Sequence, residues 1–246
     1  MDRWKYFAIT HHDHEILNPL SREKLSEFIG LLDLPRGVRV LDIGCGKGAA
    51  LLEIVERCGG RGVGVDASPQ FLDNARRTCA RHGFTDRIDF LLQDGLTYSG
   101  PPESFDLAMC MGASWIFGGF RKTLRALAGF VKPGGLVVSG EPFAYHSPEV
   151  LALAGRQLPE HAQTSHAGNV AIGVDEGLVP LYTMVSSHDD WDRYQGLQWR
   201  AAERYALEHP DDPDLPEVLQ KTRAQRDLYL RSEREELGWA LYLFRK

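Results

Sequence analysis

The nine residues from Val40 to Gly48 constrain the fold of this chain more than any other segment. They read VLDIGCGKG, a short apolar run with an aspartate at position 42, followed by glycines that alternate with other residues. The apolar run predicts a buried strand, and glycines let a backbone turn tightly and approach a ligand closely. A second apolar run ends in Asp66, eighteen residues after Gly48. That offset is typical of a βαβ unit whose acid accepts hydrogen bonds from ribose hydroxyls, so we expect a nucleoside-bearing cofactor here.

Strand and helix patterns alternate along the first 140 residues. A helix is expected at 22–32, where Ser21 can cap its start, and another at 69–82, where Ser68 precedes Pro69. Such alternation predicts a parallel sheet with helices on both faces. The further expected elements are strands at 38–43, 62–66, 87–92, 105–110 and 135–140, and helices at 47–58 and 119–130.

The pattern loosens after Phe143, where a polar, glycine-containing stretch runs to about Gly168. The expected elements beyond it are a short helix at 169–176, a strand at 178–185, helices at 189–208 and 214–235, and a terminal strand at 239–244. We therefore expect one domain over 1–246. It comprises an N-terminal lid and helix (1–34), a cofactor-binding core (35–143) and acceptor-side segments (144–246).

The order of the motifs resembles that of the class I S-adenosylmethionine-dependent methyltransferases. VLDIGCGKG and VGVDAS match the first two motifs of that family, and residues 88–95, 105–112 and 132–140 are similar to its third, fourth and fifth strands with their turns. The resemblance implies an α/β, Rossmann-like fold with a seven-stranded sheet of order 3-2-1-4-5-7-6. Helices would cover both faces, and a helical insertion would separate the last two strands. Segments such as 112–120 and 190–194 extend the resemblance to a subgroup that acts on small molecules.

The resemblance also assigns roles in binding S-adenosylmethionine and its product, S-adenosylhomocysteine. The glycine turn would meet the methionine portion and ribose, Asp42 the methionine ammonium, Asp66 the ribose hydroxyls and Asp94 the adenine amino group. The plainer alternative for each acid is a structural one, in which it caps a turn or a helix start. The expected cofactor-binding residues are Asp42, Gly44, Cys45, Gly46, Gly48, Asp66, Ala67, Gln93, Asp94, Gly95, Leu96 and Cys110.

Aromatic side chains in the second half suggest a pocket for the methyl acceptor. The expected substrate-binding residues are Trp115, Phe117, Tyr145, Trp191 and Tyr194. Core packing is the alternative for each, and the last two can instead anchor the insertion. Methyl transfer needs donor and acceptor in line and no nucleophilic triad. A general base is needed only for an acceptor that must lose a proton, and Glu141 and His14 are the catalytic candidates.

Charge, cysteine spacing and hydropathy limit the kinds of partner that this chain is expected to bind. A net charge of −6 without a long basic run disfavours nucleic acid. The fourth strand also lacks the Asn/Asp-Pro-Pro-aromatic motif that resembles methyltransferases acting on bases or protein amides, which favours a small molecule. Four cysteines without C-x-x-C spacing favour free thiols, no metal site and a cytoplasmic setting. No apolar run reaches the length of a membrane helix, and the polar start predicts no signal peptide. The acceptor, the atom methylated and the oligomeric state stay open.

Two alternatives to the enzyme remain at this point. One is a non-catalytic protein that binds S-adenosylmethionine or S-adenosylhomocysteine. The other is an NAD-dependent dehydrogenase, whose fingerprint is G-x-G-x-x-G or A. The alternating glycines disfavour the dehydrogenase, although Ala49 can serve as the last position of its fingerprint. For the enzyme, we further expect residues 1–20 to form a mobile lid that orders over the cofactor, with a frayed terminus as the alternative. We also expect residues 186–236 to cover the acceptor together with Trp115 and the stretch after Glu141.

Overall fold

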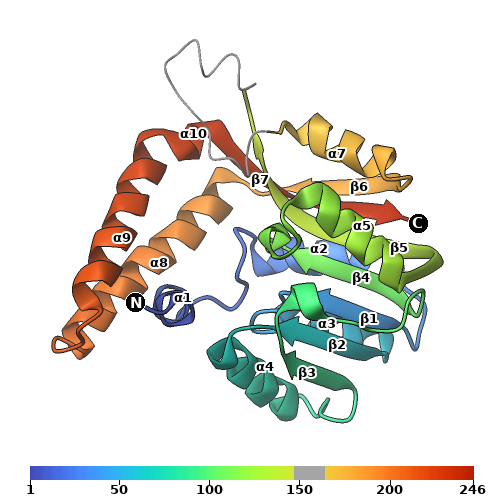
Figure 1. The fold of residues 1–246 in the computed structure, drawn as a ribbon, viewed down its shortest axis with the longest axis horizontal. Coiled ribbons are helices and arrows are strands. Elements are labelled where there is room, and N and C mark those ends of the chain that lie inside the picture. Colours follow the sequence, from blue (N-terminus) through green and yellow to red (C-terminus); the bar gives the residue numbers. More distant parts are fainter. Residues whose placement is uncertain (147–163) are drawn as a thin grey trace.

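One seven-stranded sheet runs through the centre of the computed structural model, which describes residues 1–146 and 164–246 (Figure 1). The strand order is β3-β2-β1-β4-β5-β7-β6, which confirms the predicted topology. The first five strands pair in parallel, whereas β7 runs antiparallel to both β5 and β6. The strands are β1 (Arg39–Ile43), β2 (Arg61–Asp66), β3 (Ile88–Leu92), β4 (Phe105–Met111), β5 (Val131–Ala144), β6 (Val179–Val185) and β7 (Leu237–Arg245).

Helices cover the two faces of the sheet, as the sequence predicted. Ser21 and Ser68 cap their helices by accepting hydrogen bonds from backbone amides, and Pro69 opens the second of these helices. Successive side chains of a strand point to opposite faces, so Val40 packs with α2 and α3 while Leu41 packs with α5. One face carries α2 (Arg22–Leu31), α3 (Ala49–Cys58) and α4 (Pro69–Arg81), and the other carries α5 (Phe120–Phe130) and α7 (His166–Asp175).

The insertion between β6 and β7 forms a separate helical layer beside the sheet (Figure 1). It contains α8 (His188–Glu208) and α9 (Leu215–Leu228), then a π turn (Tyr229–Glu233) and the short α10 (Arg234–Glu236). The N-terminal helix α1 (Arg3–Thr10) packs on this layer through a small apolar cluster. That cluster is formed by Tyr6, Ile9, Ala202 and Val218.

Ion pairs also join the N-terminus to the insertion. The Lys5 ammonium lies 2.7 Å from carboxylate oxygens of both Asp212 and Asp214, and the terminal amino group lies 3.0 Å from that of Glu217. Residues about 200 positions apart in sequence therefore hold α1 against α8 and α9.

Several boundaries differ from those expected. Helix α1 was not among the expected elements, and the helix expected at 214–235 is interrupted by the π turn at Tyr229–Glu233. Strand β5 is longer than the expected 135–140, because β7 pairs with it as far as Ala144. Residues 147–163 of the expected polar stretch lie outside the described residues. In the described ranges, none of the helices has both the length and the apolar character needed to cross a membrane.

Candidate active site

The glycine turn after β1 is held by the neighbouring strand. The backbone amides of Gly44 and Cys45 both donate to the carbonyl oxygen of Val65, at 2.8 and 3.1 Å. Gly46 has a φ of +54°, a conformation that glycine adopts without strain. A Cβ atom on Gly46 would lie 2.5 Å from the Leu17 side chain, so only glycine lets Leu17 pack on the turn.

Asp66 stabilises both the glycine turn and the start of α4. Its two carboxylate oxygens accept hydrogen bonds from the backbone amides of Gly46 and Ser68, each at 2.8 Å. Burial raises the pKa of Asp66, and the backbone hydrogen bonds oppose that rise. The capping role that the sequence left open is therefore present in the structure.

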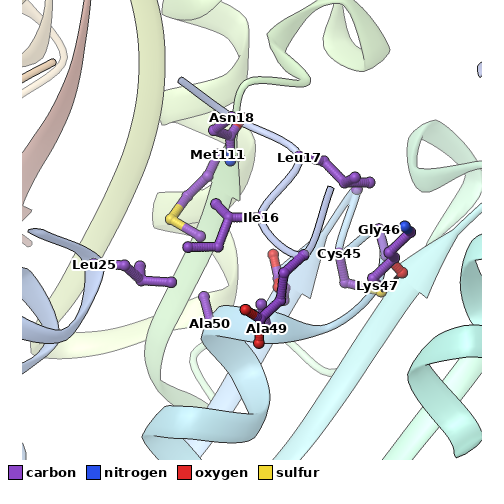
Figure 2. A pocket seen from close by; sticks show the side chains of 13 residues that line it. Ile16, Leu17, Asn18, Leu25, Cys45, Gly46, Lys47, Ala49, Ala50 and Met111 are labelled. Carbon is purple, nitrogen blue, oxygen red and sulfur yellow. Dashed lines mark hydrogen bonds between the residues drawn. The ribbon is translucent and has the colours of Figure 1, made fainter. Parts of the chain in front are cut away.

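A small cavity lies against the turn, and the buried residue Asp42 is part of its lining. The cavity has a volume of about 40 Å³. Burial raises the pKa of Asp42 to about 8, and the negative charge of Asp66 contributes to the rise. Within the described part of the chain, no donor is hydrogen-bonded to Asp42. Figure 2 shows Ile16, Leu17 and Asn18 on one side of this cavity and Cys45, Gly46 and Lys47 on the other.

A larger cavity of about 240 Å³ lies on the other side of the turn and shares Leu17, Gly44, Gly46 and Met111 with the small one. One wall comes from the carboxyl ends of the strands, where ligands bind in parallel α/β sheets. The opposite wall comes from α1, the segment after it and α8. The residues of the sheet wall include Val65, Asp66, Ala67, Asp94, Gly95, Gly112, Ala113 and Trp115, and those of the opposite wall are Arg3, Trp4, Phe7, His11, Leu17 and Tyr194.

Lys47 connects the glycine turn to the wall formed by the N-terminal segment. Its ammonium donates to the carbonyl oxygens of His11, His12 and His14 at 2.8, 3.0 and 2.6 Å. Burial lowers the pKa of Lys47 to about 8. The same segment is joined to α8 on its other side, because the Asp13 carboxylate accepts hydrogen bonds from two arginines of that helix.

Comparison with known proteins identifies the family to which this chain belongs. A family model described as a methyltransferase domain matches residues 40–135. The chain is 31% identical over 246 residues to the uncharacterized protein YjhP of Escherichia coli (strain K12), covering 98% of each chain, and the X-ray structure of YjhP matches with a TM-score of 0.89. An S-adenosylmethionine-dependent methyltransferase from Thiobacillus denitrificans, crystallised with S-adenosylhomocysteine, is 32% identical over 99% of each chain, with a TM-score of 0.86.

The chain belongs to the S-adenosylmethionine-dependent methyltransferases. It is therefore an enzyme with S-adenosylmethionine as its cofactor, and the dehydrogenase alternative is set aside. A further relative is the 27-O-demethylrifamycin SV methyltransferase of Amycolatopsis mediterranei, which is 27% identical over 88% of this chain and 80% of that protein. The unpartnered Asp42 carboxylate beside a cavity fits the ammonium of such a cofactor, and the glycine turn leaves room for close backbone approach.

Ten of the residues expected in the methyltransferase site line the two cavities. Asp42 and Cys45 line the small one, and Gly44 and Gly46 line both. The Asp94 carboxylate also accepts a hydrogen bond from the Leu96 amide at 2.9 Å, which is the turn-capping alternative that the sequence left open. The remaining expected residues in the large cavity are Asp66, Ala67, Asp94, Gly95, Trp115 and Tyr194.

Nine expected residues lie outside both linings. Trp191 stacks on Tyr229 within the insertion, with ring centroids 6.2 Å apart, and it also packs against the core cluster beneath α2 and α3, so it anchors the insertion to the domain. Tyr145 packs edge-on against Phe143, with ring centroids 5.1 Å apart. Gly48 begins α3, and Gln93 donates to Thr97. The others are the exposed Leu96, the core residues Cys110 and Phe117, and the two catalytic candidates Glu141 and His14.

His11 lines the large cavity, although the sequence analysis did not select it. Its Nε2 lies 3.0 Å from the Tyr194 hydroxyl, and burial lowers its pKa to about 3. His14 lies behind it, with Nε2 at 2.9 Å from the Tyr194 carbonyl oxygen, and burial lowers its pKa to about 4. The spacing of Trp4, Phe7 and His11 by three and four residues was the helical pattern that could have identified His11.

Glu141 is buried on the α5 side of the sheet. It accepts a hydrogen bond from Ser114, and its Oε2 atom has no partner among the described residues. Burial raises its pKa to about 7, and the hydrogen bond from Ser114 opposes that rise. In the ranges 1–146 and 164–246, no group of three or more His, Cys, Asp or Glu side chains is placed to hold a metal ion.

We expect Lys47→Met to loosen the N-terminal wall while preserving the sheet, because it removes three hydrogen bonds to residues 11–14. Hydrogen exchange monitored by mass spectrometry should show faster exchange at the N-terminus and unchanged exchange in β1 and β4. Lys122→Met, at an exposed position of α5, is the matched control. Unchanged exchange at residues 1–20 would show that Lys47 does not hold this segment.

We expect Glu141→Gln to change how stability depends on pH. The pKa of Glu141 is raised from 4.5 to about 7 in the folded protein, so the folded state retains a proton that the unfolded state loses. Stability should fall as pH rises from about 4.5 to 7, by up to about 3 kcal/mol. The glutamine variant should lack this fall, so its advantage over the wild type should be larger at pH 8 than at pH 5. Denaturant unfolding at both pH values, with Glu27→Gln at an exposed position of α2 as control, measures the effect. Equal advantages at both values would refute it.

Proposed function

We propose that this methyltransferase transfers the methyl group to a small molecule bound in the part of the large cavity that α1 and α8 line. The observation that carries the proposal is the enclosure of this space between the carboxyl ends of the strands and the helices α1 and α8. The cavity of about 240 Å³ would also hold the ribose and adenine beside Asp66 and Asp94, so the space left near α1 and α8 suits a small acceptor and leaves little room for a folded macromolecular surface. The similarity to an enzyme named for a demethylrifamycin also supports a small acceptor.

The two walls meet across the mouth of the cavity through aromatic and cationic contacts. The Arg3 guanidinium lies 3.8 Å from the centroid of the Trp115 ring, and the Trp4 and Trp115 rings are 6.5 Å apart. Stacking of this kind covers apolar surface while the cation remains near water. The contact supports a role for α1 as the cover of the acceptor, with Trp115 as its counterpart on the sheet side.

Cofactor binding follows from the groups that face the cavities. We assign Asp42 to the ammonium of the methionine portion, because it is a buried carboxylate with no donor of its own. Asp66 and Asp94 would accept from the ribose and adenine, and the backbone of Gly44 to Gly46 would lie against the ligand. When bound, S-adenosylmethionine supplies a methyl group activated by the positive sulfur. The protein would hold donor and acceptor in line and exclude water. Because the acceptor itself attacks the methyl group, the transfer requires no nucleophilic side chain of the protein.

The acceptor class is tested by following a labelled methyl group. The enzyme would be incubated with methyl-labelled S-adenosylmethionine and a cell extract separated into small molecules, proteins and nucleic acids. We expect the label to enter the small-molecule fraction. Label in the protein or nucleic-acid fraction, with none in the small molecules, would contradict the proposal.

We expect Asp66→Ala to weaken S-adenosylmethionine binding by about 1.5–3 kcal/mol, tenfold or more, because charge-assisted hydrogen bonds are lost. Calorimetric titration measures this affinity. Since Asp66 also supports the glycine turn, far-ultraviolet circular dichroism must show that the variant is folded. Asp73→Ala, which removes an exposed carboxylate from α4, is the control and should bind normally. A folded variant with wild-type affinity would remove Asp66 from the cofactor site.

A further inference from the structure

A chain of hydrogen bonds leads from the backbone of α1 to the wall of the large cavity. The Thr10 hydroxyl donates to the carbonyl oxygen of Tyr6 at 3.0 Å. The same hydroxyl oxygen lies 3.0 Å from Nδ1 of His11, and Nε2 of His11 lies 3.0 Å from the hydroxyl of Tyr194. His11 and Tyr194 both line the cavity.

The hydrogen bond from Thr10 to the Tyr6 carbonyl oxygen determines which atom donates in each of the other two bonds. A carbonyl oxygen can only accept, so the single hydroxyl proton of Thr10 is used on Tyr6. The Thr10 oxygen must then accept from His11, which places the imidazole proton on Nδ1. Burial and the nearby His14 lower the pKa of His11, so the ring is neutral and carries no second proton. Nε2 is therefore an acceptor, and the Tyr194 hydroxyl donates its one proton to it.

His14 provides an internal contrast, because its neighbours impose the opposite tautomer. Its Nε2 lies 2.9 Å from the carbonyl oxygen of Tyr194, which can only accept. The proton of the neutral His14 ring is therefore on Nε2, and Nδ1 is left without a partner among the described residues. The two histidines have ring centroids 5.0 Å apart and should carry their protons on different ring nitrogens.

We propose that the Thr10–His11–Tyr194 chain presents the Tyr194 oxygen to the cavity as a hydrogen-bond acceptor, and thereby selects a methyl acceptor with an O–H or N–H group. This inference rests on the proposed small-molecule function and narrows its substrate class. The proton of Tyr194 is committed to His11, and burial raises the pKa of Tyr194, so the phenol stays protonated. A ligand group that donates satisfies the remaining oxygen lone pair. A purely apolar group, or one that only accepts, leaves that lone pair unpaired at a cost.

Within this arrangement Tyr194 contacts the acceptor, and His11 is a positioning residue that acts through Tyr194. The arrangement also explains why His11 is kept neutral. A protonated His11 would donate from Nε2, and Tyr194 would then have to turn its own proton elsewhere. The result would be a donor in the cavity, with the opposite preference for ligands.

The tautomers are tested by nitrogen-15 NMR of the histidine rings at pH 7 in the protein loaded with S-adenosylhomocysteine. We expect the Nδ1–H tautomer for His11 and the Nε2–H tautomer for His14, with the two assigned by single-histidine substitution. An Nε2–H or doubly protonated His11 would overturn the proposed direction of the chain.

Ligand selection is tested with phenol and anisole as probes, because both are aromatic and accept hydrogen bonds but only phenol donates one. We expect the wild-type protein with S-adenosylhomocysteine to bind phenol about fivefold more tightly than anisole, the effect of one hydrogen bond. Tyr194→Phe should lose this preference, and Tyr182→Phe, at an exposed position of β6, should retain it. Equal binding of the two probes by the wild type, or an unchanged preference in Tyr194→Phe, would overturn the proposal.

Two substitutions of His11 separate positioning from packing. In His11→Gln the side-chain oxygen can take the place of Nε2 and accept from Tyr194, so the preference for phenol should remain. In His11→Asn the side chain is too short to reach that position, so the preference should fall. Equal behaviour of the two variants would contradict the positioning role. None of these results depends on label entering the small-molecule fraction, so failure of this inference and failure of the proposed function can be told apart.

Discussion

The carboxylate of Asp66 is the interaction on which the site most depends. It accepts from the backbone amides of Gly46 and Ser68, and so fixes the glycine turn against the start of α4. These bonds lie at the carboxyl ends of β1 and β2, where the sheet has no further strand residues to pair. A buried carboxylate is stable there because two amide donors replace its lost water.

The rest of the active site is arranged around that turn. Leu17 packs on Gly46 and separates the small cavity from the large one, and Lys47 extends from the turn to three carbonyl oxygens of the N-terminal segment. The glycine turn, the two cavities beside it and the N-terminal segment are therefore parts of one connected structure. Because α1 is also joined to α8 and α9, the contacts of Lys47 connect the turn to the helical layer as well.

The βαβ unit with the glycine turn could be predicted from sequence because its structure is local. The apolar run before Gly44 and the acid that follows the next strand specify a βαβ unit within about thirty residues. The position of the N-terminal helix against the insertion could not be predicted in this way. Its partners Asp212 and Asp214 lie some 200 positions away, and its apolar cluster is completed by residues of the insertion. His11 was missed for the same reason, since only the packing of α1 brings it to Tyr194.

Trp191 and Tyr194 lie on the same helix but have different surroundings in the structure. Both were expected to face the acceptor, and they are three residues apart on α8. Trp191 packs on the π turn through Tyr229, whereas Tyr194 reaches the large cavity. The sequence marks both as aromatic residues of one amphipathic helix, and the position of the neighbouring turn decides which of them remains available to a ligand.

We propose that the glycine turn and its buried acids hold the cofactor, and Asp42 offers the most direct test of this assignment. Burial raises its pKa to about 8, so it is largely protonated at pH 7 in the free enzyme, and it must ionise to bind an ammonium group. Calorimetric titration with S-adenosylhomocysteine at pH 7, in buffers of different ionisation enthalpy, measures the protons exchanged. We predict release of about one proton in the wild type and none in Asp42→Asn. Binding without proton release in the wild type would contradict the assignment of Asp42 to the ammonium group of the cofactor.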